Sequence, residues 1–252
     1  MTIGPSWQLM VALVALVGLT VVASRLGRLG ICRASVVASA RAMAQLAVVS
    51  LILVYALQHL WAAVVFTIVM FAVAVATTVG RTGVGRAWPW TAVAVASGVL
   101  PVLAIIFCSG AAPVNAASLV PLAGIIIGNM MNGHTLAGRR LFPELRESIG
   151  TFEAALSLGL PRADAIRMVT EDSIAEAVIP SVDSTRTVGL VPLPGAFIGV
   201  LLGGGSALQA GAAQLLVLVG ILAGQAVTVV VAHRLVCAGL LLPPDLRRAL
   251  HE

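Results

Sequence analysis

The sequence predicts an all-α membrane protein, a polytopic bundle of about seven transmembrane helices. Of its 252 residues, 60% are hydrophobic and only 10% are charged, a composition outside the usual range of soluble domains. Apolar runs also recur along the chain, several of them near the length of about 20 helical residues that crosses a bilayer. One transmembrane domain over residues 1–252 accounts for the chain, so the lipid bilayer is its main surrounding and no large extramembrane enzyme domain is expected.

The apolar runs are bounded by charges, by Gly and Pro breaks and by Trp residues. The predicted spans cover residues 7–23, 35–57, 60–79, 90–108, 116–136, 187–204 and 210–232. The stretch MTIGPSWQLM lacks the basic segment of a signal peptide, so the first run is expected to remain as a span. All four Trp residues fall at predicted span ends, where interfacial anchors belong.

The basic residues indicate the orientation of the spans. All fifteen are Arg, and every one except Arg41 lies in the connections 24–34, 80–89, 137–186 and 233–252. Because short positive loops stay in the cytoplasm, the N-terminus is predicted outside and the C-terminus cytoplasmic, with Arg41 snorkelling from the second span. The expected location is the plasma membrane, specifically a bacterial cytoplasmic membrane. No dense basic run is present, so no nucleic-acid partner is expected.

The acidic residues bear on the source of energy. Eight of the ten lie between Glu144 and Asp183, and the predicted spans contain none. Carriers driven by protons or sodium usually bind the ion on an intramembrane acid, so the absence of acids from the spans weakens that class. A stand-alone secondary carrier or channel for a small solute or ion remains the alternative interpretation. The chain also lacks a GxxxxGK[ST] phosphate-binding loop. We therefore expect no enzyme activity and no cofactor in this chain.

The connection 137–186 is predicted to form a cytoplasmic helix, a tight turn and a second helix. Apolar residues recur at helical spacing after a break at residues 159–161. A hairpin of this kind has one face free to enter a groove on a partner protein. Its segment EAALSLG resembles the EAA loop of ABC-transporter membrane subunits, which docks on the ATP-binding subunit. The resemblance assigns the coupling role to Glu153, Ala154, Ala155, Gly159 and Pro161.

Three motifs in order resemble the FetB-type permease family, which comprises bacterial iron-export permeases and plant membrane proteins linked to aluminium tolerance. They are PLAGIIIGN at 121–129, the EAA-like loop, and TVGLVPLPGAFIGVLLGG at 187–204. The resemblance covers roughly residues 35–232 and includes the RxxxQ pattern of Arg41 and Gln45. It implies the permease subunit of an ABC exporter for iron or another metal. Such a subunit pairs with itself and with two P-loop ATP-binding subunits that hold ATP and Mg²⁺.

The family often carries methionines directly after its LPG motif, and this chain departs from that pattern. Ala196 and Phe197 occupy these positions. The departure removes soft metal ligands and weakens the assignment of iron as the substrate.

Small and polar residues within the spans predict either a substrate passage or a helix-packing contact. In the fifth span, Gly124, Gly128 and Asn132 share one face, and Asn129 lies beside it. Glycines at this spacing allow close backbone approach, whereas intramembrane amides usually face a bundle interior or a water-filled cavity. The second span offers a comparable polar pair, Arg41 and Gln45, for a substrate, a neighbouring helix or a second copy of the chain.

Two further patterns concern metal binding and helix breaking. Met130 and His134 are four residues apart, a spacing at which a thioether and an imidazole can share a soft metal ion. An interfacial histidine is the alternative. In the sixth span, prolines and glycines predict a broken or hinged helix, because proline removes a backbone donor. These residues are Gly189, Pro192, Pro194 and Gly195.

Overall fold

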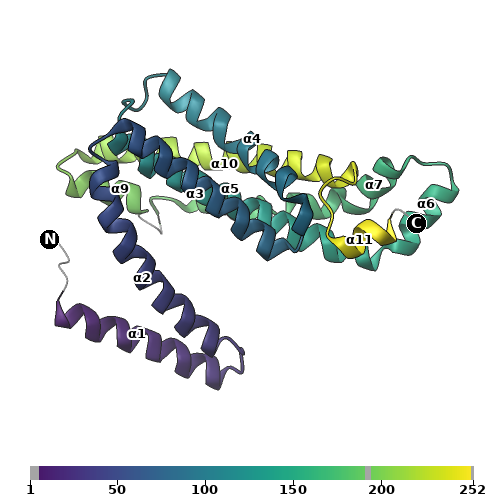
Figure 1. Cartoon of the computed structure of the whole chain (residues 1–252), viewed down its shortest axis with the longest axis horizontal. Helices are drawn as coiled ribbons and strands as arrows, with labels where there is room; N and C mark the ends of the chain where they lie inside the picture. The colour runs from purple at the N-terminus through teal and green to yellow at the C-terminus, as the bar shows by residue number, and fades with distance from the viewer. Residues whose placement is uncertain (1–5, 191–193, 251–252) are drawn as a thin grey trace. The chain divides into compact units, whose positions relative to one another are not determined.

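The computed structural model describes residues 6–190 and 194–250, which form helices and no strand (Figure 1). Six helices are long and apolar enough to cross a membrane. They are α1 Trp7–Leu26, α2 Cys32–Ala56, α3 Leu60–Thr82, α4 Trp88–Cys108, α5 Ala116–Glu147 and α10 Ala207–Cys237. The shorter helices are η1 Gly85–Ala87, α6 Ile149–Ser157, α7 Arg162–Ala175, α8 Ile179–Thr187, α9 Gly195–Leu202 and α11 Pro244–Ala249. The prediction of an all-α polytopic membrane protein is confirmed.

The region of the predicted sixth span, 187–204, has a different construction from the other spans. Its helix α9 has eight residues, about 12 Å at 1.5 Å per residue, whereas the hydrocarbon core is about 30 Å thick. Helix α8, which the sequence places at the end of the cytoplasmic connection, packs against α10. The helical path is interrupted between Thr187 and Gly195, where glycine and proline are concentrated. Six long helices and this discontinuous pair agree with about seven spans.

The chain divides into two compact units, Met1–Ala62 and Ala63–Glu252. The first is a hairpin of α1 packed on α2. Ser6 is the N-cap of α1, and its side chain accepts the Leu9 N–H. The hairpin buries almost none of its own side chains. Lipid or protein therefore has to cover this apolar hairpin, since water would be an unfavourable surrounding.

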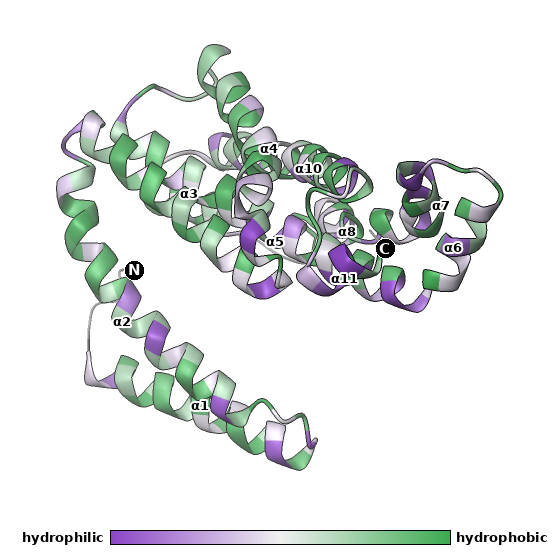
Figure 2. Ribbon diagram, turned by 45° about the vertical axis from the view of Figure 1, so that its right-hand side comes forward, coloured by the Kyte–Doolittle hydropathy of each residue, from purple (hydrophilic) through white to green (hydrophobic). Residues whose placement is uncertain are grey.

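The second unit is built around α4, α5 and α10, which pack on one another. Their shared apolar core contains Val95 and Val99 from α4 together with Ile126 and Met130 from α5. In the hydropathy colouring of Figure 2, α3, α4 and α10 are largely hydrophobic, whereas hydrophilic residues gather on α7 and the last part of α5. This distribution separates an apolar region from a polar end within the same unit.

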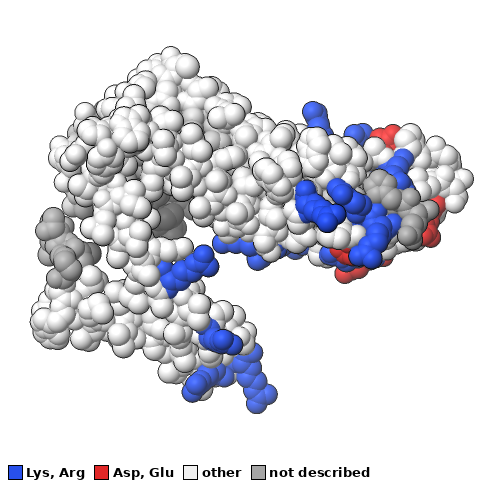
Figure 3. Space-filling view, viewed as in Figure 1, with Lys and Arg blue, Asp and Glu red and all other residues white. Residues whose placement is uncertain are grey.

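The polar end of the second unit, which we call the arginine-rich end, has its own apolar core. The core joins the last turns of α5 and α10 with residues of α6, α7 and α11, including Leu145, Phe152, Ile166, Val236 and Leu246. Arginines and carboxylates surround this core on the surface, whereas the surface over α4 carries no charge in the same view (Figure 3). The α6–α7 hairpin is therefore part of a folded core and is not a free loop.

Candidate coupling and transport site

The EAA-like segment forms the end of α6 and its turn into α7, as the sequence predicts. Gly159 has a φ of 89°, the left-handed conformation that glycine adopts without steric cost. Its N–H donates to the Leu156 carbonyl at 2.9 Å, and the Leu160 N–H donates to the Ala155 carbonyl at 3.1 Å. These two bonds form a Schellman motif, which closes a helix. Pro161 is then the N-cap of α7, so the glycine and the proline set the hairpin turn.

The hairpin has a buried base and an exposed tip. Phe152 and Ala155 are buried in the core of the arginine-rich end. Glu153 and Ala154 lie on the opposite, exposed side of α6, and Leu158 at the tip is 83% exposed. An apolar tip beside a carboxylate is a suitable shape and chemistry for insertion into a groove on another protein.

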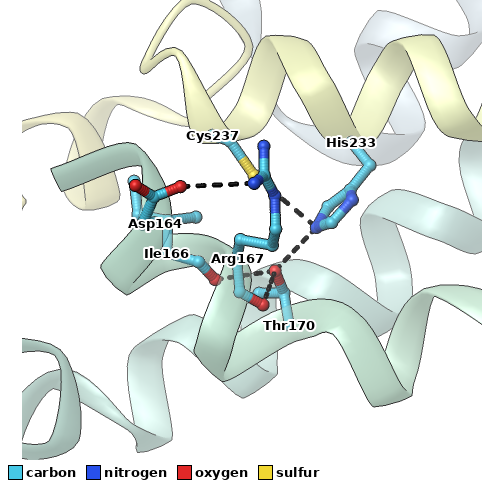
Figure 4. A network of polar contacts seen from close by, with 6 residues as sticks. All are labelled: Asp164, Ile166, Arg167, Thr170, His233 and Cys237. Atoms are coloured by element: carbon cyan, nitrogen blue, oxygen red, sulfur yellow. Dashed lines mark hydrogen bonds and ion pairs between the residues drawn. The ribbon is translucent and has the colours of Figure 1, made fainter. Parts of the chain in front are cut away.

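A polar contact joins the hairpin to the end of α10 (Figure 4). The buried Thr170 Oγ1 lies 2.8 Å from His233 Nε2 and also donates to the Ile166 carbonyl at 2.8 Å. Because a hydroxyl has one hydrogen, the imidazole N–H is the donor in the first contact. The Cys237 Sγ lies 3.6 Å from the same nitrogen. This contact connects α7 directly to a membrane-length helix.

Ion pairs hold neighbouring parts of the arginine-rich end together. Arg140 on α5 pairs with Glu176 at the end of α7 at 3.2 Å, and Arg146 pairs with Asp245 on α11 at 2.7 Å. The hydrogen bond from Arg146 lowers the pKa of Asp245 below its ordinary value. Each pair is about half exposed, so each contributes little stability alone; their effect is to orient the elements around the hairpin.

A second polar cluster lies between α5, α8 and α10. Gln225 donates from Nε2 to the Asn129 carbonyl at 3.0 Å, and the Ser181 hydroxyl donates to Gln225 Oε1. The Asn129 side chain donates to the Ile125 carbonyl of its own helix at 2.8 Å. The predicted polar residue Asn129 is therefore part of a cluster whose other members, Gln225 and Ser181, were not predicted from the sequence. The missed signal was Gln225, an amide within the predicted span 210–232.

Asn132, the other predicted amide of α5, is exposed. Its Oδ1 accepts a hydrogen bond from Arg81 Nη1 of α3 at 3.4 Å. The two asparagines therefore have different surroundings: Asn129 is half-buried and its backbone carbonyl accepts from α10, whereas Asn132 lies at the surface with an arginine. Asn132 is the more exposed of the two to solvent or substrate.

Of the predicted glycine pair of α5, Gly124 packs closely against a neighbouring helix and Gly128 does not. A Cβ on Gly124 would lie 2.8 Å from Met70 Cε of α3, whereas nothing lies within 4 Å of a Cβ on Gly128. A closer helix contact lies between α4 and α10, where a Cβ on Gly98 would collide with the Gly224 carbonyl oxygen. The signal that could have found this contact is the GxxxG pattern of residues 220–224.

Met130 and His134 are both buried in the second unit. The Met130 Sδ lies 2.8 Å from a Cβ built on Gly224, so the thioether fills the contact between α4 and α10. Neither ring nitrogen of His134 has a hydrogen-bond partner. Within the described residues, no group of three or more His, Cys, Asp or Glu side chains could hold a metal ion. Metal binding by this pair stays a prediction.

The comparison with known proteins identifies the family. The sequence model described as "Uncharacterised protein family (UPF0014)" matches residues 6–241. The chain belongs to the UPF0014 family. Its relatives include the UPF0014 membrane protein STAR2 of Oryza sativa subsp. japonica, 31% identical over 211 residues, which are 82% of this chain and 74% of the rice protein. The chain is therefore a multi-pass membrane protein of this family.

Two bacterial relatives agree with the family predicted from the motifs. The UPF0014 membrane protein YjkA of Bacillus subtilis is 29% identical over 211 residues, covering 80% of this chain and 82% of that protein. The probable iron export permease protein FetB of Escherichia coli is 30% identical over 149 residues, covering 59% of this chain and 58% of FetB. The predicted membership of the FetB-type family is confirmed. No solved structure matches the chain.

The broken-helix motif of this UPF0014 protein borders two hollows. Pro194 is the N-cap of α9 and lines a hollow with Gly189, whose φ is 81°. Gly195 lines a second hollow of about 990 Å³, between α9 and the first turns of α5 and α10. Pro192 lies outside the described residues. The predicted break therefore occurs where the chain leaves space between helices.

The predicted polar pair of the second span lies in the first unit of the UPF0014 protein. Arg41 and Gln45 are one turn apart on α2, and both side chains are exposed. They present two polar groups on one face of the hairpin, in agreement with their i, i+4 spacing. Their contact with a substrate or a second copy stays a prediction.

Proposed function

We propose that this UPF0014 protein is the permease subunit of an ABC exporter. The observation that carries the proposal is the α6–α7 hairpin, with an exposed apolar tip and a base packed into the helix bundle. The tip at Leu158 and Glu153 would dock on a separate P-loop ATP-binding subunit. That subunit would supply ATP and Mg²⁺, and two copies of the permease would assemble with two copies of it.

The contacts of the hairpin support a route for the motion. A push on the tip would displace α7, and the Thr170–His233 contact would carry the displacement into α10. From α10, the hydrogen bonds of Gln225 reach α5 and α8. The discontinuous segment α8–α9 is the part of the bundle most easily rearranged, because no continuous helix holds it together. In this proposal, its rearrangement switches access to the passage.

The substrate in this proposal is iron or another metal. One relative is named as a probable iron export permease, and another, of Arabidopsis thaliana, is named Protein ALUMINUM SENSITIVE 3. The deciding measurement is metal accumulation in cells that lack this protein, compared across iron, manganese, zinc and aluminium. Unchanged accumulation of all four metals would remove the metal assignment.

Docking of the hairpin is tested by co-purification with the ATP-binding subunit. Leu158→Asp places a charge on the exposed tip and is expected to abolish co-purification. Leu208→Asp is the matched control, because Leu208 is 84% exposed and lies at the first turn of α10, away from the arginine-rich end. If both variants co-purify with the ATPase as the native chain does, the hairpin is not the docking element.

A stand-alone secondary carrier is the second candidate, favoured by one observation. Asp183 lies on α8, which packs against α10, so a carboxylate is closer to the membrane helices than the sequence indicated. Efflux from proteoliposomes separates the two candidates. Metal efflux by the permease alone, driven by an ion gradient, would support the carrier; efflux only with the ATPase subunit and ATP would support the exporter.

A further inference from the structure

Helix α8 lies beside the middle of α10. At one end, Ser181 donates a hydrogen bond to Gln225; just beyond the other end, Val188 lines a hollow together with Leu218. The residues of α8 between these two contacts therefore run alongside the Leu218–Gln225 stretch of α10, in the opposite direction.

This position places α8 at membrane depth. Helix α10 has 31 residues, and the hydrocarbon core takes about 20 of them. Every window of about 20 residues within Ala207–Cys237 contains the stretch 218–225. Whichever part of α10 crosses the bilayer, α8 therefore lies beside a segment inside the hydrocarbon core.

The exposed face of α8 carries two opposite charges at this depth. Asp183 and Arg186 are one turn apart, with Arg186 Nη1 lying 3.5 Å from Asp183 Oδ1. Their side chains are 60% and 74% exposed, respectively. A charged pair that is this open is costly in lipid, and intramembrane charges normally face protein or a water-filled cavity. Protein or a water-filled cavity therefore has to cover this face of α8, and a protein surface with matching charges would satisfy both groups.

The distribution of carboxylates in the chain indicates which surface this is. A surface that adds a second ion pair here has to offer an acid to Arg186 and a base to Asp183, yet residues 1–62, which form the α1–α2 unit, contain no Asp or Glu. The other acids before Asp183 lie between Glu144 and Glu176, on α5, α6 and α7 or just after them, and α10 contains none. A second copy of α8 offers both an acid and a base at the same depth.

We infer that α8 is the contact surface between two copies of this chain in the membrane, with Asp183 of each copy paired with Arg186 of the other. A two-fold interface brings the same patch of both subunits together, so one acid and one base on a single face are self-complementary. The inference rests on the homodimer of the proposed function and adds where the copies meet. Each copy thereby adds an intermolecular ion pair to charges that are otherwise paired only within their own helix.

Disulfide cross-linking tests the position of the contact. Ser184 directly follows Asp183 in α8 and is exposed, so Ser184→Cys, in a chain whose Cys32, Cys108 and Cys237 are replaced by Ala, should form a cross-linked dimer on oxidation in membranes. The matched control is Leu100→Cys on α4, which is 65% exposed and should remain monomeric on gels.

Charge exchange tests the pairing. Asp183→Arg and Arg186→Asp each place like charges together and are expected to reduce the Ser184→Cys cross-link at least tenfold. The double exchange D183R/R186D restores opposite charges and should recover the cross-link, which also shows that the chain still folds.

The outcomes separate this inference from the proposed function. One outcome would overturn the α8 contact in favour of a water-filled cavity: the protein is dimeric, Ser184→Cys gives no cross-link, and its cysteine reacts with a membrane-impermeant maleimide. The proposed exporter function would not be affected by this result. A protein that is monomeric in membranes by single-molecule photobleaching would overturn both. Cross-linking that is lost in both single variants and recovered in the double variant supports the inference.

Discussion

The glycine that closes α6 offers the sharpest test of the coupling hairpin. Gly159 has a φ of 89°, and nothing lies within 4 Å of a Cβ built on it. Gly159→Ala therefore adds no collision and changes only the cost of the left-handed conformation, which is about 1–2 kcal/mol for a residue with a Cβ. If docking requires this turn, that cost corresponds to a roughly 5- to 30-fold weaker affinity for the ATP-binding subunit.

The assay is the dissociation constant between the purified permease and its ATP-binding subunit, together with hydrogen exchange of the Leu160 amide. Gly159→Asn should lie between glycine and alanine, because asparagine tolerates left-handed backbone better than most residues. The control is Gly150→Ala, since Gly150 is helical and also has nothing within 4 Å of a Cβ. This change should leave affinity unchanged and stabilise α6 by about 0.5–1 kcal/mol.

Two results would refute the reasoning. Unchanged affinity and unchanged exchange in Gly159→Ala would mean that the turn is not needed for docking. An equal loss of affinity in Gly150→Ala would mean that any change in α6 disturbs the complex, so the left-handed turn has no special role.

Three further changes test other parts of the structure. Gly98→Ala should lower the free energy of unfolding by about 1–3 kcal/mol through overpacking against α10, whereas Gly128→Ala, in a helix and with nothing within 4 Å of its Cβ, should raise it by about 0.5–1 kcal/mol; equal thermal stability of the two would contradict the assigned contact. Thr170→Val removes the hydroxyl contact with α10 and should cost about 1–3 kcal/mol, with less transport per ATP hydrolysed than in the native chain. Asp245→Asn tests pH dependence. Because Arg146 lowers the folded pKa of Asp245, the native chain should be more stable than the variant above the ordinary pKa of 3.8. This difference in stability should vanish as the pH falls through the lowered folded pKa. Melting temperatures at several pH values measure the difference, and an advantage that grows on acidification would contradict the sign.

Much of the fold follows from local sequence patterns. Six predicted spans have counterparts within a few residues of their bounds, apart from α5, which continues past the predicted end at 136 to Glu147. The extension is helical because Leu141 and Leu145 pack into the core of the arginine-rich end; a hydropathy reading ends the span at the first arginines. The turn at Gly159 was equally local, since a glycine followed by a proline is a helix-ending pattern.

The functional residues were predicted less completely because their partners are distant in the sequence. The intramembrane amide Asn129 was visible, but the hydrogen bond from Gln225 to its carbonyl, and the one from Ser181 to Gln225, depend on how α8 and α10 pack. The two asparagines of α5 looked equivalent by spacing, yet Asn132 is exposed and Asn129 is half-buried beside α10. Spacing on one helix cannot specify which neighbour covers each face.

By itself, the sequence determined the class of protein, the positions of the long helices and the hairpin turn, because hydropathy, charge and turn chemistry act between neighbouring residues. The tertiary structure alone decided which glycines allow close helix contact, how α7 joins α10, and that α8 lies beside α10. These features depend on contacts such as Thr170–His233, between residues 63 positions apart. Such contacts follow from the packing of whole helices, and no local pattern encodes them.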